Sequence, residues 1–128
     1  MTRPLIFVLL IALAGCEATD PVMRKVQGLF EPTKAQQTLS AGLKQYEDGK
    51  YEQSQKSLQS AIQQGLGERD RVTAYKHLAF IHCISSRERQ CREDFKKALA
   101  IDPGMDLAPE EADHPMWGRV FRSVKAGR

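Results

Sequence analysis

The chain has 128 residues, among them 19 Lys and Arg and 16 Asp and Glu, and its formal net charge at pH 7 is +3. This length suits one small domain, and a charge balance so close to neutral does not indicate a nucleic-acid partner. Aromatic residues make up only 7%, and runs of Val, Ile and Thr are absent, whereas Gln, Leu, Ala, Lys and Glu are common. The composition therefore favours an all-α fold over a sheet.

The first 15 residues have the pattern of a secretory signal. Arg3 supplies a positive start, and an uncharged apolar run extends from Leu5 to Ala14. This run is too short to cross a bilayer, which takes roughly 20 apolar residues. Residues 13–16, Leu-Ala-Gly-Cys, resemble a bacterial lipobox. The resemblance implies that residues 1–15 are removed and that Cys16 carries a diacylglycerol thioether; an ordinary cleaved signal with an incidental Cys16 is the alternative.

A lipid on Cys16 implies a position in the cell envelope, anchored to a membrane at its periplasmic face. Two or three acyl chains anchor a protein stably where one does not. In lipoproteins of enteric-type bacteria an Asp after the lipidated Cys often signals inner-membrane retention, and here Glu17 follows, which favours the outer membrane. Residues 16–33 are interpreted as a lipidated tether and residues 34–128 as a helical domain.

Capping residues and glycines predict the first helices. Within the tether, Asp20 and Pro21 begin a short helix that ends near Gly28. Thr33 and Gln36 form a capping box, so the next helix begins near Lys34 and runs to about Asp48, where Gly49 ends it. A further helix spans about 51–64, before Gly65 and Gly67.

The same signals predict the remaining helices. Asp70 caps a helix over about 71–84, and residues 85–87 form a turn. The next helix spans 88–101 and ends at Asp102-Pro103-Gly104. One helical turn is predicted after Pro109, and His114-Pro115 begins the last helix, which runs to about 125. Its apolar residues are Met116, Trp117, Val120, Phe121 and Val124.

Two pairs of similar helices prompt a search for an internal repeat. Residues 72–105 resemble the 34-residue tetratricopeptide repeat, with matches at Tyr75, Leu78, Ala79, Phe95, Ala98 and Pro103. Residues 35–68 resemble it less fully, through Gly42, Leu58 and Ala61. Small residues at the eighth and twenty-seventh places allow two helices to approach closely. The chain is therefore predicted to contain two helix–turn–helix repeats followed by a capping helix, since stacked repeats need a cap.

The first helices of such repeats line a concave face, where a partner helix or extended peptide can bind. The alternative is that the chain fills its own groove with Val26, Leu29 and Phe30 from the tether. The residues predicted to form this groove are Leu39, Leu43, Tyr46, Lys76, Phe80 and Ile84.

Cys83 and Cys91 are an even pair beyond the lipobox cysteine. The turn between their helices brings them near each other, so a disulfide is favoured over two buried thiols and over a redox pair. His77 and His82 are five residues apart, about 140° around a helix, which argues against a shared metal, and His82 is interpreted as a packed core residue.

No catalytic constellation, cofactor motif or metal-binding spacing emerges, and an enzyme is disfavoured. Glu110, Glu111 and Asp113 form an acidic cluster without a facing partner, which is interpreted as a solvated helix start.

Residues 74–125 resemble a more specific family, the small repeat-containing lipoproteins associated with type VI secretion systems (TssQ type). The specific parts are the cysteine pair, the Arg-Glu-Arg-Gln-Cys turn at 87–91, and the Pro-Glu-Glu-Ala and His-Pro-Met-Trp-Gly runs at 109–118. The resemblance implies an accessory or scaffold that binds proteins of the secretion membrane complex, and it supplies no reaction. A pilotin-like assembly chaperone for an envelope component is the alternative function.

Overall fold

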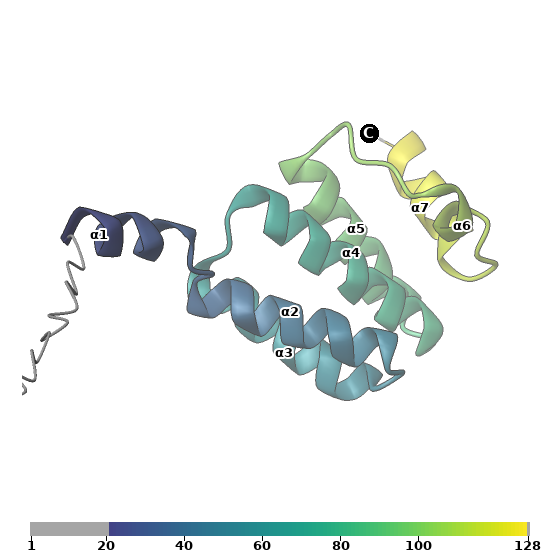
Figure 1. Ribbon diagram of the computed structural model, residues 1–128. Coiled ribbons are helices and arrows are strands. Elements are labelled where there is room, and N and C mark those ends of the chain that lie inside the picture. The colour runs from purple at the N-terminus through teal and green to yellow at the C-terminus, as the bar shows by residue number, and fades with distance from the viewer. Residues whose placement is uncertain (1–20, 128) are drawn as a thin grey trace, which may run out of the picture. The chain divides into compact units, whose positions relative to one another are not determined.

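The computed structural model describes residues 21–127, and every element in that range is a helix, which confirms the all-α class (Figure 1). The chain divides into two units, Met1–Glu31 and Pro32–Arg128. The first unit contains α1 (Pro21–Phe30), which continues past Gly28, where the sequence predicted its end. The prediction was wrong because Gly28 does not adopt the positive φ of a helix-ending glycine.

Helices α2 (Lys34–Glu47) and α3 (Tyr51–Gly65) form the first hairpin of the second unit. The predicted capping box is present: Gln36 N donates to Thr33 Oγ1 at 3.2 Å, and Thr33 N donates to Gln36 Oε1 at 2.8 Å. Gly49 follows α2 with a φ of +75°, a conformation that favours glycine. Both ends of α2 therefore form where the sequence predicted them.

The first hairpin closes around Gly42. A Cβ at Gly42 would lie 3.0 Å from Leu58 Cδ2, so a larger residue would require the Leu58 side chain to shift. Ser54 Oγ donates to Gly42 O at 2.7 Å, and this buried hydrogen bond ties the helices at their closest approach. Leu58 and Ala61 are fully buried beneath this contact.

Helices α4 (Glu68–Ile84) and α5 (Glu88–Ile101) form the second hairpin. Helix α4 begins at Glu68, earlier than the sequence predicted, because Gly67 adopts the extended N-cap conformation. Asp70 thus lies inside the first turn, where its carboxylate interacts favourably with the positive end of the helix dipole. Asp70 also accepts a hydrogen bond from Gln36 Nε2 at 3.3 Å.

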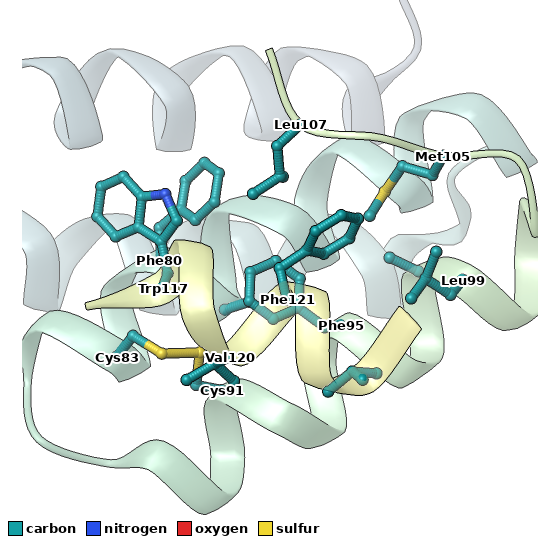
Figure 2. Packing of buried hydrophobic residues seen from close by; sticks show 13 residues of the cluster. Phe80, Cys83, Cys91, Phe95, Leu99, Met105, Leu107, Trp117, Val120 and Phe121 are labelled. Carbon is teal, nitrogen blue, oxygen red and sulfur yellow. A yellow bond between two sulfur atoms is a disulfide. The ribbon is translucent and has the colours of Figure 1, made fainter. Parts of the chain in front are cut away.

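Helices α6 (Pro109–Ala112) and α7 (Trp117–Ala126) complete the domain. Helix α7 packs against α5 and α4, much as α4 packs against α3 and α2. Four of the predicted apolar residues are buried there, but Met116 precedes the helix and is 40% exposed. Figure 2 shows α7 over the core formed with α4 and α5. Large buried side chains of this core include Phe80, Phe95, Leu99, Trp117 and Phe121.

Candidate functional site

The six residues predicted to form a groove do not make an open apolar channel. Phe80 is 1% exposed and Leu39 is 6% exposed, so both belong to the hydrophobic core. The indole of Trp117 stacks on the ring of Phe80, with centroids 4.3 Å apart (Figure 2). The prediction that Phe80 faces a partner was therefore wrong, because α7 covers it. The other predicted residues, Leu43, Tyr46, Lys76 and Ile84, are half-buried.

A patch of polar and aromatic side chains remains at the partly open part of this face. We call it the inner patch and define it by Tyr46 from α2, Lys76 and His77 from α4, and Glu111 from α6. Lys76 Nζ and Glu111 Oε1 form an ion pair at 3.0 Å, and both side chains are less than one-quarter exposed. Partial burial strengthens such a pair relative to one at the surface.

Glu111 also organises the chain around itself. Its Oε2 accepts a hydrogen bond from Ala108 N at 3.0 Å, and its backbone carbonyl accepts one from Trp117 Nε1 at 2.8 Å. The expectation that the acidic cluster lacks a facing partner was wrong for Glu111, since Lys76 reaches it across the fold. The charge pair therefore joins α4 to the segment that carries Trp117.

The rings of the inner patch are packed edge to face. The centroids of Tyr46 and His77 are 5.1 Å apart with an interplanar angle of 86°, and Tyr51 lies 5.5 Å from Tyr46. Burial raises the pKa of Tyr46 to about 12, with smaller contributions from Tyr51 and Glu111. The phenol therefore stays protonated at neutral pH and is able to donate a hydrogen bond.

His77 is held in one tautomer. Its Nδ1 lies 2.8 Å from the carbonyl oxygen of Thr73. Because a carbonyl only accepts, Nδ1 carries the proton and Nε2 keeps the lone pair. Burial lowers the pKa of His77; the charge of Lys76 adds to this, while the Thr73 hydrogen bond opposes it. The inner patch thus combines a neutral imidazole, a phenol and an internally neutralised charge pair.

The predicted cysteine pair forms a disulfide. Cys83 at the end of α4 and Cys91 in α5 are bonded, with their Cα atoms 5.2 Å apart, within the usual range for a bridge. Both residues are buried beside Val120 of α7 (Figure 2). Cys16, the predicted lipid attachment point, lies outside the described residues.

A second polar pair, which the sequence analysis missed, lies inside the second hairpin. His82 and Asp94 are each 6% exposed, and His82 Nδ1 contacts Asp94 Oδ2 at 2.5 Å. Burial raises the pKa of Asp94, whereas the hydrogen bond and charge of His82 lower it. Gln45 and Ser57 occupy the equivalent places in the first repeat, and the sequence alone does not show that these two places are in contact.

An imidazole paired with a carboxylate can act in catalysis if a nucleophile lies near it. The pair borders a hollow of about 410 Å³, lined by Gln59, His82, Arg89, Gln90, Glu93, Asp94 and Lys97. None of these lining residues is a Ser, Thr or Cys. The pair is therefore better explained as a structural contact that satisfies two buried polar groups.

Within residues 21–127, no group of three or more His, Cys, Asp or Glu side chains is placed to hold a metal ion. No helix in that range combines the length and the hydrophobicity needed to cross a membrane.

A scan of protein-family models, a search of curated proteins and a search of solved structures found no significant match to this chain.

Proposed function

We propose that this chain is a lipid-anchored periplasmic module that binds proteins of a type VI secretion apparatus as an accessory or scaffold. The proposal combines the Leu-Ala-Gly-Cys sequence at 13–16 with the resemblance of residues 74–125 to the TssQ-type lipoproteins. The described domain contributes a surface for binding and no evident reactive centre.

The packing of the helices supports a tetratricopeptide-type arrangement. Helices α2 and α4 are the first helices of the two predicted repeats, and α7 contacts α5 and α4 in the way that α4 contacts α3 and α2. Helix α7 thus takes the place of the first helix of a third repeat, as expected of a cap. The first helices of such arrays line their binding face.

The inner patch is the observation that carries the proposed binding function. It lies on α2, α4 and α6 and is bordered by the exposed side chain of Glu47, whose charge acts on His77. Tyr is among the residues enriched where proteins bind one another. We expect a partner segment that places a hydrogen-bond acceptor at Tyr46 and a donor at His77 Nε2.

The test compares two charge variants in cells that express the secretion genes. The patch variant combines Glu47→Lys with Lys76→Gln. The matched control combines Glu52→Lys with Lys56→Gln, because Glu52 and Lys56 form an exposed ion pair on α3, with nitrogen and oxygen 3.3 Å apart. Each tagged protein is solubilised from membranes, and its co-purifying proteins are identified by mass spectrometry.

We expect subunits of the secretion membrane complex with the wild type and the control, and at least a tenfold loss with the patch variant. Thermal unfolding followed by circular dichroism checks that the patch variant is folded. Equal recovery by a folded patch variant would exclude the inner patch as the binding surface. Absence of secretion subunits from the wild-type sample would contradict the proposed function itself.

A further inference from the structure

Helix α1 has an apolar face whose residues recur at helical spacing. The positions i, i+4, i+7 and i+8 from Val22 are all apolar, so these side chains share one stripe. Every large apolar residue of the helix is exposed, from Val26 at 42% to Phe30 at 82%. The members of this apolar face are Val22, Met23, Val26, Leu29 and Phe30.

The remainder of α1 is polar and basic. Arg24 and Lys25 supply two positive charges, and the helix contains no acidic residue. Gly28 lies about 200° around the axis from Val26, on the side opposite the apolar face. An apolar face combined with cationic flanks is the pattern of a helix that lies in a membrane interface.

A helix of this size needs a surface to stabilise it. Isolated helices shorter than roughly 12–15 residues are marginal in water, and α1 spans 10. The groove at Phe80 does not offer such a surface, because Trp117 already stacks on that ring. Helix α7 therefore covers Phe80, one of the six residues of the predicted groove.

Its place in the sequence puts α1 close to the proposed anchor. Pro21 follows Cys16 by five residues, which span at most about 18 Å when fully extended. A lipid on Cys16 would thus hold α1 within reach of the bilayer surface. Anionic headgroups there attract Lys and Arg, and each such charge contributes about 1 kcal/mol, or roughly a fivefold gain in affinity.

We propose that α1 lies in the membrane interface, with its apolar face at the boundary of headgroups and acyl chains and with Arg24 and Lys25 at anionic phosphates. This inference rests on the proposed lipid at Cys16 and adds a second, non-covalent attachment to the membrane. The helix would then restrict the tether to the bilayer surface.

The test measures the depth of α1 in a bilayer. The full chain is purified from membranes and reconstituted in vesicles of phosphatidylethanolamine and phosphatidylglycerol. Val26→Cys and, as a matched control, Gly28→Cys each receive a fluorophore; a Cβ at Gly28 meets nothing within 4 Å, so this substitution fits the helix. Cys83 and Cys91 are bonded to each other, and the proposed thioether blocks Cys16, so the introduced thiol alone is labelled.

A quencher attached to the lipid acyl chains reports contact with the bilayer. We expect it to quench the label at residue 26 at least threefold more strongly than the label at residue 28. Replacing Arg24 and Lys25 by Gln should weaken the quenching at residue 26 in these vesicles. Equal, weak quenching at both sites would overturn the inference, and so would a blue-shifted label at residue 26 that lipid does not quench, because protein would then cover the face.

Mass spectrometry of the Cys16 peptide separates this inference from the proposed function. A lipidated peptide without selective quenching overturns only the interfacial position of α1. An unmodified Cys16 overturns both the anchor and the inference that rests on it.

Discussion

The two helical hairpins use equivalent positions for different chemistry. In the first hairpin, Ser57 Oγ donates to Gln45 Oε1 at 2.7 Å. In the second, Asp94 and His82 stand at these positions and form a buried pair. A second equivalent position differs in the same way. Cys91 forms the disulfide with Cys83 in the second hairpin, whereas Ser54, at the same place in the first hairpin, donates a hydrogen bond to the backbone carbonyl of Gly42.

The sequence thus acts on these contacts in two ways. The repeat decides which positions of neighbouring helices meet, and the residue types decide how strong and how condition-dependent the contact becomes. Neutral hydrogen bonds in the first hairpin respond to neither redox state nor mild acid. The second hairpin carries a reducible bond and buried ionisable groups, and α7 covers it as well.

The largest expected effect comes from removing the cover on the second hairpin. A Cβ at Gly118 would lie 2.1 Å from the carbonyl oxygen of Ala112, a clash with backbone that a side-chain movement cannot relieve. Although Gly→Ala usually stabilises a helix, we expect Gly118→Ala to destabilise the domain by about 3 kcal/mol. Urea unfolding followed by Trp117 fluorescence measures the change.

Gly127→Ala is the control for this substitution, because its Cβ would make an ordinary contact at 3.5 Å from Ser123 O. This variant should differ little from the wild type. A Gly118→Ala protein as stable as the wild type would show that α6 and α7 can separate without consequence for the second hairpin.

Loss of the disulfide should have the next largest effect. The bridged residues are eight positions apart, and closing so short a loop stabilises the folded state by about 2–3 kcal/mol. We expect Cys83→Ala combined with Cys91→Ala to lower the free energy of unfolding by that amount. Reductant should destabilise the wild type similarly and leave the double variant unaffected; a reductant effect on the double variant would contradict this assignment.

The buried pair and its neutral counterpart provide a direct comparison. Asp94→Ala leaves His82 buried without its partner, for which we expect a loss of about 2 kcal/mol. Ser57→Ala breaks a half-buried neutral hydrogen bond, and about 1 kcal/mol is expected. Chemical denaturation of both variants measures the difference, and equal losses would contradict the idea that residue type sets the strength of this contact.

The smallest expected effect is a change in pH dependence through His77. Because its pKa is lowered in the folded state, the unfolded chain binds this proton more readily. The contribution of His77 to stability is therefore present above its ordinary pKa of about 6.5 and is lost as the pH falls through the folded-state value.

His77→Gln should make the unfolding free energy less dependent on pH below 6.5. Ser40 occupies the equivalent position in the first hairpin, so Ser40→Gln serves as a control that should leave the acid dependence unchanged. Unfolding curves recorded between pH 4 and pH 8 measure both slopes, and identical slopes for His77→Gln and the wild type would remove His77 as a source of acid sensitivity.

Local sequence signals predicted most helix boundaries correctly. The Thr33 capping box and the positive φ of Gly49 depend on residues close in sequence, so their chemistry is readable without the fold. The start of α4 was missed because Gly67 lacks a capping side chain and Asp70 offered a stronger but misleading signal. The disulfide was favoured correctly because a short turn brings the two cysteines together.

The prediction of which residues line the binding face was only partly correct. Leu43, Tyr46, Lys76 and Ile84 are half-buried as a lining surface requires, whereas Phe80 and Leu39 are core residues. Periodicity places a residue on a face of its helix, but it does not say what later covers that face. The ion pair between Glu111 and Lys76 could not be predicted from the sequence for the same reason.

The sequence by itself determined the helices, their pairing into hairpins and the positions at which paired helices approach, because caps, glycines and repeat spacing act over short distances. Only the tertiary structure decided which of the aligned side chains stay accessible. Trp117 closes the site at Phe80, and Glu111 reaches Lys76 from 35 residues away. These contacts depend on how the segment after α5 folds back over α4, and no local pattern specifies that path.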